Sequence, residues 1–456
     1  MKQRIAVVGA GIAGVGAAWS LSRAGHEVDI FEANEQLGGN AKTHDWTIGG
    51  RTLTAGLAVL AWPEAYFKNY GRLLEELGLP TEPVRLRFFI QKGAEYYAHE
   101  LGGPLAERYA DDLVRWRRLV TWVRRMNERV SGGGAPSLYR VSYLNPLTYL
   151  PAWPLARAFG ISRGFWDDIV VALYSSSFLT TRLAQLPAVI LPTLDDLISV
   201  DGGGRMRSWS GHAGQVFEGM LRALRGAVHR ATPITYVRGD EHGVELRDAR
   251  GGTHRYDAAV LAGSATRISA ALDARAHPRA RRLLGKVRYV EATDPTFVEG
   301  HAHADASVLP AAHRARILAD YCTFIDIVER PEGRRYENHF VVSSWAPIAR
   351  ASGATMLVYY GKPEARSLAG AVRTFSNRGG HPELSHGNLL VARRLRRLQG
   401  HGRLYYCGSY TTPGNGHDLS LLSGFVAASA LGAPHPFAVD AGCAEDFRLL
   451  RRLMLG

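Results

Sequence analysis

Cysteine is scarce in this chain: its 456 residues include three, Cys322, Cys407 and Cys443, and none forms a CxxC pair. This excludes a disulfide framework and a thiolate zinc site, and it favours a reducing compartment. Long apolar runs are also missing, since none reaches the ~18 residues of a membrane-spanning helix. The start, MKQRIAVVGAG, breaks at glycines and has no A-x-A cleavage pattern. We therefore expect a cytoplasmic protein, with a peripheral position at the membrane as an alternative.

Acidic residues are fewer than basic ones, 42 against 55, which gives a net charge of +13. A nucleic-acid binder, a membrane-surface protein and a binder of phosphorylated ligands could all carry such an excess. No DNA- or RNA-binding motif accompanies the charge, so we expect no nucleic-acid partner. Ser-His-Asp, HExxH and P-loop motifs are absent as well. With 46% hydrophobic and 21% charged residues, the composition is that of a globular protein, and the length allows two or three domains at ~150 residues each.

The first forty residues carry the most specific pattern. Arg4 to Val8 is a short apolar run typical of a buried parallel strand, and it leads into the glycine-rich stretch 9–14, GAGIAG. A helical pattern follows up to Gly25, and a second strand, Glu27 to Phe31, ends at Glu32. This strand–GxGxxG–helix–strand–acid unit indicates a dinucleotide-binding fold.

Each residue type in the unit has a physical role. Gly9 permits the tight turn, Gly11 lets the backbone approach a pyrophosphate, and Gly14 lets helix and strand pack closely. The helix N-terminus, at Ile12 and Ala13, offers unpaired N–H groups to the phosphates. The Glu32 carboxylate can accept both ribose hydroxyls, and it would repel the 2′-phosphate of NADP.

The continuation of this unit carries a family resemblance. Residues 32–43 read E-x-x-x-x-x-G-G-x-x-x-T, with the glycine pair at Gly38 and Gly39. In this stretch the chain resembles the FAD-dependent amine oxidase and phytoene desaturase superfamily, in which the glycine pair lies along the FAD pyrophosphate. The common form has Arg after the pair, whereas this chain has Asn40, with a cation two positions later at Lys42.

Two further segments resemble FAD motifs of the same superfamily. Strand patterns at 233–237 and 256–262, downstream of Trp209–Gly214, match the arrangement that lays a backbone strand against the adenine, here through Val237. A meander without ligand contact is the alternative. Near the C-terminus, the strand 404–407, the Gly408-Ser409 turn and a helix over 420–431 match the motif whose helix N-terminus faces the flavin pyrimidine edge, with Ser420 and Leu421 at the donor positions. Cys407 is expected to be a buried small hydrophobe.

Within the superfamily, the chain is most similar to a bacterial subfamily of predicted NAD/FAD-binding proteins and to flavin-dependent polyunsaturated fatty acid isomerases. The stretches 54–59, 299–310 and 416–418 carry that similarity, although Thr54 replaces an acid and Ser409 stands where many oxidases have Glu or Ala. The motifs and the resemblance together assign FAD contacts to Gly9, Gly11, Ile12, Ala13, Gly14, Glu32, Ala33, Gly38, Gly39, Asn40, Lys42, Gly56, Leu57, Val237, Gly408, Ser409, Ser420 and Leu421.

Catalytic candidates outside the FAD motifs are few. His417 could move protons beside the flavin, or the His417-Asp418 pair could simply cap the following helix through Asp418. Tyr360, with Tyr359, could form a wall of the flavin site. His301, His303 and Asp305 alternate as metal ligands might, but without a companion cluster we expect solvent-facing strand residues and no metal.

Two basic amphipathic stretches remain unassigned by the cofactor. In 113–130 and 447–455, apolar residues fall on one helical face and arginines cover the rest. The faces are either solvated sides of core helices or contacts for an anionic membrane surface or an acidic carrier protein. The aromatic and proline-rich stretch 143–154 has three alternatives: it could pack in the core, line an apolar pocket, or contact the surface of a bilayer.

We therefore predict an α/β flavoprotein with one non-covalent FAD. A discontinuous Rossmann-type FAD-binding domain (1–61, 201–275, 396–440) would be interleaved with a mixed α+β substrate domain (62–200, 276–395), followed by a basic C-terminal helix (441–456). The resemblance implies hydride transfer between a substrate C–H and flavin N5, in desaturation or double-bond isomerisation of a hydrophobic acyl, polyketide or isoprenoid chain. Amine oxidation and a non-catalytic FAD-binding partner are the alternatives.

Overall fold

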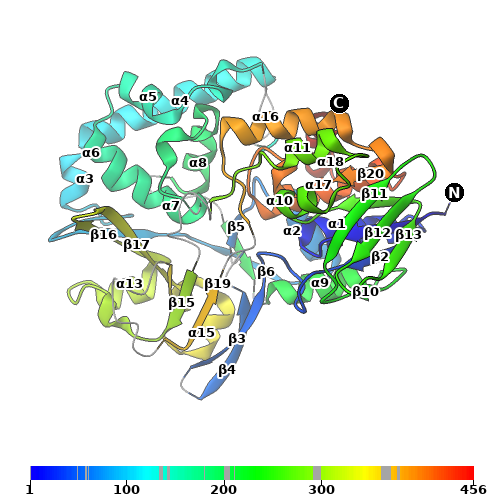
Figure 1. The fold of residues 1–456 in the computed structure, drawn as a ribbon. Helices are drawn as coiled ribbons and strands as arrows, with labels where there is room; N and C mark the ends of the chain where they lie inside the picture. The colour runs from blue at the N-terminus through cyan, green and yellow to red at the C-terminus, as the bar shows by residue number, and fades with distance from the viewer. Residues whose placement is uncertain are drawn as a thin grey trace.

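The computed structural model describes residues 2–48, 50–56, 59, 61–132, 137–140, 144–178, 180–199, 206–209, 211–290, 299–360, 371–376 and 380–456. Two bodies of secondary structure are visible in Figure 1, one on each side of the molecule. Each is organised around its own sheet. Among the described residues, no helix is both long enough and apolar enough to cross a bilayer.

A parallel sheet of five strands forms the centre of the first body. Its order is β10 (Val228–His229), β2 (Glu27–Phe31), β1 (Arg4–Val8), β14 (Ala258–Leu261) and β20 (Leu404–Tyr406). Alternate residues of these strands point to opposite faces. Ile5 and Val7 join one core cluster and Ala6 the other, so the sheet is buried on both sides. The Rossmann-type α/β fold class is confirmed.

Helices cover one face of this sheet and a meander with further helices covers the other (Figure 1). The first layer holds α1 (Ile12–Arg23), α2 (Lys68–Glu76), α9 (Ala213–Leu221), α17 (His417–Ala430) and α18 (Ala441–Met454). The second holds β11 (Ile234–Gly239), β12 (Val244–Asp248), β13 (Thr253–Tyr256), α10 (Ala265–Ala271), α11 (Pro278–Leu284) and α16 (His386–Leu395). Helices α1 and α17 approach so closely that a Cβ on Gly424 would lie 2.1 Å from the Ala13 carbonyl oxygen.

A mixed sheet of seven strands forms the second body. Its order is β19 (Arg373–Ser376), β15 (Glu299–His303), β18 (Leu357–Tyr360), β17 (Gly333–Val341), β16 (Thr323–Arg330), β7 (Phe88–Lys92) and β8 (Glu95–Ala98). One face packs on α3 (Pro104–Arg108), α4 (Ala110–Ser131), α5 (Ala152–Ala158), α6 (Arg163–Phe165), the π-helical turn Trp166–Val170, α7 (Val171–Phe178) and α8 (Leu191–Leu197). On the other sides lie α13 (Arg314–Asp320), α14 (Val342–Trp345) and α15 (Pro347–Ser352).

Two small sheets complete the described strands. One pairs β3 (Thr43–Ile48) with β4 (Arg51–Gly56), and the other has the order β5 (Ala61–Pro63), β9 (Met206–Trp209), β6 (Thr81–Val84). Along the chain, groups of strands belong in turn to the five-stranded and to the seven-stranded sheet, so each large sheet is assembled from separate chain segments. The domain boundaries expected from the sequence stay a prediction.

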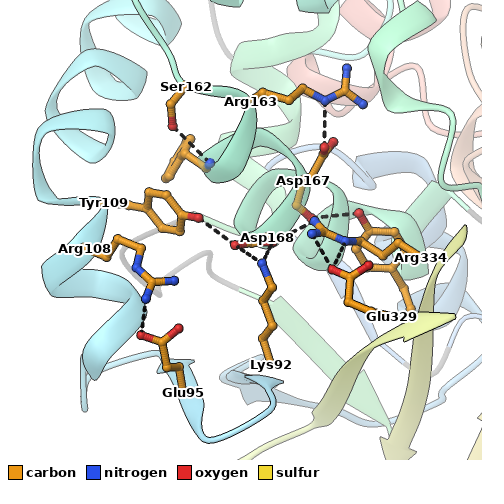
Figure 2. A network of polar contacts seen from close by, with 12 residues as sticks. Lys92, Glu95, Arg108, Tyr109, Ser162, Arg163, Asp167, Asp168, Glu329 and Arg334 are labelled. Atoms are coloured by element: carbon orange, nitrogen blue, oxygen red, sulfur yellow. Dashed lines mark hydrogen bonds and ion pairs between the residues drawn. The ribbon is translucent and has the colours of Figure 1, made fainter.

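A buried carboxylate joins the helical layer to the seven-stranded sheet. Asp168, in the π-helical turn, is fully buried and accepts hydrogen bonds from the Nζ of Lys92, the guanidinium of Arg334 and the hydroxyl of Tyr109. Figure 2 shows these three donors converging on Asp168 from β7, β17 and the start of α4. The ion pairs hold the helices over the sheet, because an unpaired charge at this depth would be costly.

Both basic stretches form helices: α4 is longer than the pattern 113–130, and α18 covers most of the predicted helix 441–456. Helix α4 extends over Ala110–Ser131 and buries Trp116, Leu119, Val120 and Val123, while α18 begins at Ala441 because the Asp440 side chain accepts a hydrogen bond from the Cys443 N–H at 2.8 Å. The apolar side of α18 packs into the same core as α17. The three cysteines are buried and free, as expected for Cys407.

Candidate functional site: a dinucleotide cradle and an apolar cavity

The turn between β1 and α1 has the tight geometry that its glycines predict. Gly9 adopts φ +106°, which only glycine tolerates without strain. A Cβ on Gly14 would lie 1.9 Å from the Gly9 carbonyl oxygen. Both glycines are therefore required by the packing of the turn itself.

Gly11 differs from these two glycines, because no contact within the protein requires a glycine at this position. A Cβ on Gly11 would meet only the Cα of Gly39, at 3.9 Å, so the protein leaves this space open. The N-terminus of α1 opens into the same cavity: Gly11 is its N-cap residue, no side chain caps it, and its first turn has no acidic residue. Unpaired N–H groups beside open space fit a pyrophosphate, which Gly9, Gly11, Ile12, Ala13, Gly38 and Gly39 would border.

Glu32 is held in place at the end of β2. One carboxylate oxygen accepts a hydrogen bond from the Ala10 N–H at 2.9 Å, and the other accepts from the Asn34 backbone N–H at 2.9 Å and its side-chain amide at 2.7 Å. Glu32 is 7% exposed and lines the cavity together with Ala33 and Asn34. A fixed carboxylate in this position fits a ribose diol. Sequence reasoning missed the part of Asn34, which orients the acid.

Asn40 and Lys42, the two polar residues that follow the glycine pair, have different surroundings. The Asn40 side chain turns to the segment at Gly380, whose carbonyl oxygen accepts its N–H at 3.3 Å. Lys42 also lines the cavity, and its ammonium makes no ion pair with any described residue. Lys42 is therefore better placed than Asn40 to meet a negative charge on the cofactor.

The opposite end of the cradle lies against β11 and β14. Val237 is buried and lines the cavity with Ile234 and Thr235, as the adenine assignment requires, and its carbonyl oxygen also accepts the Asp273 N–H at 2.9 Å. Gly263, Ser264 and Arg267, which follow β14, line the same end. The sequence offered a signal for these three residues, since β14 leads directly into α10, as β1 leads into α1.

At α17 the structure shifts the predicted donors. The helix begins at His417, three residues earlier than the pattern indicated, and the Ser420 N–H donates to the Gly416 carbonyl oxygen at 3.0 Å. The amides left without intrahelical partners are those of residues 417–419. Ser420 still lines the cavity with Gly408 and Ser409, whereas the cavity wall does not include Leu421, whose side chain packs at Gly16.

His417 lies at this helix N-terminus and lines the cavity. Its ring packs edge-on against Tyr70, with centroids 4.9 Å apart, and its Nε2 has no hydrogen-bond partner among the described residues. Desolvation lowers the pKa of His417 to about 3, so the imidazole is neutral at pH 7. It can offer a hydrogen bond or accept a proton, but it does not place a positive charge beside the cofactor.

Asp418 does not cap the helix, contrary to one expectation. The N-cap residue is Gly416, and the fully buried Asp418 carboxylate accepts the Tyr70 N–H and the Tyr139 hydroxyl, each at 2.7 Å. Burial raises the pKa of Asp418 to about 7, and these two hydrogen bonds oppose the rise. The carboxyl thus ties α17 to α2 and to the cavity-lining segment 137–140.

The two tyrosines at the end of β18 face opposite sides of the sheet. Tyr360 lines the cavity and meets Phe340 edge-on at 5.5 Å. Tyr359 instead stacks on His339, at 4.9 Å, on the other side. Tyr360 alone keeps the predicted place in the cavity wall.

The expectation that His301 and His303 face solvent is wrong. Each is 3% exposed, since β15 lies inside the sheet between β18 and β19 and aromatic rings pack beside both imidazoles: Tyr359 lies 6.2 Å from His301 and His339 lies 6.1 Å from His303, centroid to centroid. Asp305 caps a short helical turn by accepting the Ser307 N–H at 2.8 Å. In the described part of the chain, no group of three or more His, Cys, Asp or Glu side chains is arranged to hold a metal ion.

Two predicted FAD contacts stay predictions. Leu57 lies outside the described residues, and Gly56 ends β4, where it pairs with Thr43.

Beyond the cradle, the cavity continues into the second body and has a total volume of about 1500 Å³. That exceeds the ~300–1000 Å³ of a site for one small ligand, so a cofactor and a substrate can share it. The extension is lined mainly by apolar side chains: Leu86, Phe88, Phe178, Val189, Ile190, Leu194, Ile198, Met206, Phe340, Val342, Trp345 and Val358.

Comparisons with known proteins agree with this geometry. A family model described as an NAD(P)-binding Rossmann-like domain matches residues 7–77. The flavin-dependent L-tryptophan oxidase RebO of Lentzea aerocolonigenes is 29% identical over 133 residues, 29% of this chain and 28% of that protein. The 4,4'-diapophytoene desaturase of Staphylococcus haemolyticus is 40% identical over 75 residues, 16% of this chain and 15% of that protein. The matches thus span well under a third of these relatives.

A solved structure extends the likeness to the whole chain at the level of the fold. The fatty acid isomerase from P. acnes that produces CLA superposes with a TM-score of 0.66 at 16% identity, covering 92% of this chain and 97% of the isomerase. Of these proteins, the L-tryptophan oxidase is named as flavin-dependent. The family model is concentrated on the dinucleotide-binding unit that ends near Glu32, the sequence matches cover under a third of the chain, and the solved structure extends the likeness of the fold over nearly the whole chain.

Proposed function

We propose that this protein is an FAD-dependent enzyme that desaturates, or isomerises a double bond in, a hydrophobic acyl, polyketide or isoprenoid substrate. The observation that carries the proposal is the apolar extension of the cavity, which begins where α17 points into it. Bound FAD would supply the hydride acceptor and donor at its N5 atom.

The apolar wall would bind and orient the substrate. Phe340, Trp345 and Val358 come from the seven-stranded sheet and its adjoining helix, and they face the same space as residues of α7 and α8. Burial of an extended hydrocarbon against such a wall contributes ~25 cal/mol per Å². The same wall excludes water, which protects a reactive C–H site from side reactions.

The N-terminus of α17 would stabilise negative charge on the reduced cofactor. Its unpaired amides at residues 417–419 and the helix dipole favour an anion there. The neutral His417 adds no charge, so its part is a hydrogen bond or a proton acceptor. Lys42, which lines the cavity just after the glycine pair, would meet the cofactor phosphates.

The names of three related proteins support an apolar substrate. A diapophytoene desaturase and a hydroxysqualene dehydroxylase are among the sequence matches, and a fatty acid isomerase shares the fold. Each of these names refers to a long hydrocarbon chain.

Amine oxidation is a second candidate, favoured by the match to a tryptophan oxidase and by the Asp196 carboxylate in the cavity lining. Asp196 already accepts hydrogen bonds from the Tyr66 hydroxyl and from Arg124 at 2.6 Å. A substrate ammonium would have to compete with Arg124 for it.

The test is anaerobic mixing of the FAD-loaded protein with a panel of unsaturated fatty acids, isoprenoids, amines and NAD(P)H, followed by flavin absorbance and product mass. We expect bleaching, or a product of unchanged mass, with a fatty acid or an isoprenoid. Bleaching by amines alone would establish the second candidate instead. A protein that binds FAD but gives neither bleaching nor product with any member of the panel would be a non-catalytic FAD-binding partner.

A further inference from the structure

One face of α4 combines exposed arginines with exposed apolar side chains. Taking ~100° per residue, Val114, Arg118, Trp122, Arg125 and Arg129 fall within an arc of about 80° on the solvent side of the helix. We call these five residues the α4 face. All five are exposed, and Val114 and Trp122 are among the few large hydrophobic side chains left at the surface, at 43% and 38% exposure.

The charge of the α4 face is uncompensated. Arg118, Arg125 and Arg129 make no ion pair with any residue in the described part of the chain. Asp111, the acidic residue in the same arc, pairs with Arg115 at 3.7 Å, and Arg124 beside the arc pairs with Asp196. A row of free guanidinium groups attracts an anionic surface.

The other flank of the same helix reaches the cavity. Arg124, Asn127, Glu128 and Ser131 of α4 line it. Figure 1 shows α4 at the outer edge of the helical layer, next to α5. One side of the Trp122 ring packs against Phe159, which follows α5, with centroids 5.6 Å apart. A surface seated on the α4 face would therefore contact a helix that also lines the cavity.

We propose that the α4 face docks the protein on an anionic lipid bilayer. Trp122 and Val114 would enter the headgroup region, and the three free arginines would meet lipid phosphates while their aliphatic stems lie along the acyl boundary. The mixture favours a bilayer over an acidic carrier protein, because two exposed apolar side chains, Val114 and Trp122, lie among the arginines of the face. The interaction needs no catalysis, so it is tested independently of the proposed function.

Helix α18 provides a matched control. Arg448, Arg451 and Arg452 are exposed and unpaired among the described residues, but none of the exposed large hydrophobic side chains lies on that helix. It therefore has the charge of the α4 face without its apolar component.

The experiment is cosedimentation of the full FAD-loaded chain with vesicles of phosphatidylcholine, with or without phosphatidylglycerol, at low and high salt. We expect binding that requires phosphatidylglycerol. R118Q/R125Q should weaken it by about 30-fold at low salt, since each cation near an anionic surface contributes about fivefold. Trp122→Gln should weaken it at both salt concentrations, and R448Q/R451Q should leave it within about twofold. Flavin absorbance and thermal unfolding verify that each variant is folded.

Several results would overturn the proposal. The proposal fails if the wild type does not bind anionic vesicles, or if both α4 variants bind as the wild type does. It also fails if R448Q/R451Q loses as much vesicle binding as R118Q/R125Q. Light scattering that shows a dimer dissociated by Trp122→Gln would assign the face to a second copy of the chain. Retention of an acidic carrier protein without vesicle binding would assign it to that partner.

Discussion

The Nζ of Lys92 lies 2.9 Å from both carboxylate oxygens of Asp168, although 76 positions separate the two residues in the sequence. Lys92 ends β7, and Asp168 lies in the π-helical turn above it. Arg334 adds a second cation at 2.7 Å from Asp168, so two positive charges depend on one buried acid.

Asp168→Asn should destabilise the protein by about 3–5 kcal/mol, because it leaves two cations without their anion in a partly buried place. Chemical denaturation of the FAD-loaded protein measures the effect. Asp167→Asn is the control, since Asp167 pairs with the largely exposed Arg163 and should cost less than about 1 kcal/mol. Equal effects of the two substitutions would contradict the assigned role of Asp168.

Two glycine substitutions separate packing from ligand binding. Gly14→Ala places a Cβ against the Gly9 carbonyl oxygen and should destabilise the apoprotein. Gly11→Ala meets no protein atom within 3.9 Å, so it should leave the apoprotein stable and weaken FAD binding by at least tenfold, about 1.4 kcal/mol. Thermal unfolding without FAD and flavin fluorescence titration measure the two effects. Normal FAD affinity in Gly11→Ala would disprove the pyrophosphate assignment.

The raised pKa of Asp418 predicts a specific pH dependence of stability. Its pKa in the folded state, about 7, lies above the ordinary value, so the protonated acid favours folding. The stabilisation is complete below about pH 4 and is lost as the pH rises through about 7, by up to about 4 kcal/mol. Asp418→Asn keeps an acceptor for the Tyr70 N–H and should flatten this part of the stability profile. A variant as pH-dependent as the wild type would refute the assignment.

His417 predicts the shape of a rate profile. Because burial lowers its pKa to about 3, it does not titrate between about pH 5 and 8. His417→Gln should lower the rate of flavin reduction by substrate without moving any inflection near pH 6.5. Stopped-flow absorbance at several pH values checks this. Loss of an inflection near pH 6.5 in the variant would mean that the imidazole becomes hydrated and charged in the working enzyme.

The dinucleotide cradle was predictable because its chemistry is local. Gly9, Gly14 and Glu32 act within one turn, one helix and one strand, and their spacing alone implies their contacts. The start of α17 was not predictable in the same way. Its N-cap is a glycine without a side chain, and Asp418, which a local pattern presents as a cap, accepts a hydrogen bond from Tyr139, 279 positions away.

The burial of His301 and His303 could not be read from alternation. A period of two places both residues on one face of a strand, but it does not reveal whether another layer covers that face. Only the pairing of β15 with strands on both edges identifies it as an interior strand. The apolar wall was missed for a related reason: its residues come from six separate parts of the chain and share no motif.

The order of strands in the parallel sheet has a consequence for how the protein forms during synthesis. Strands β1 and β2 leave the ribosome first, β10 and β14 follow about 200 residues later, and β20 and α17 come within the last 53 residues of the 456. The GxGxxG turn therefore waits for nearly the whole chain before its sheet is complete, and pairings of such long range are slow to form. A chain that ends before residue 404 would keep every residue of the fingerprint and still lack the last strand beside it.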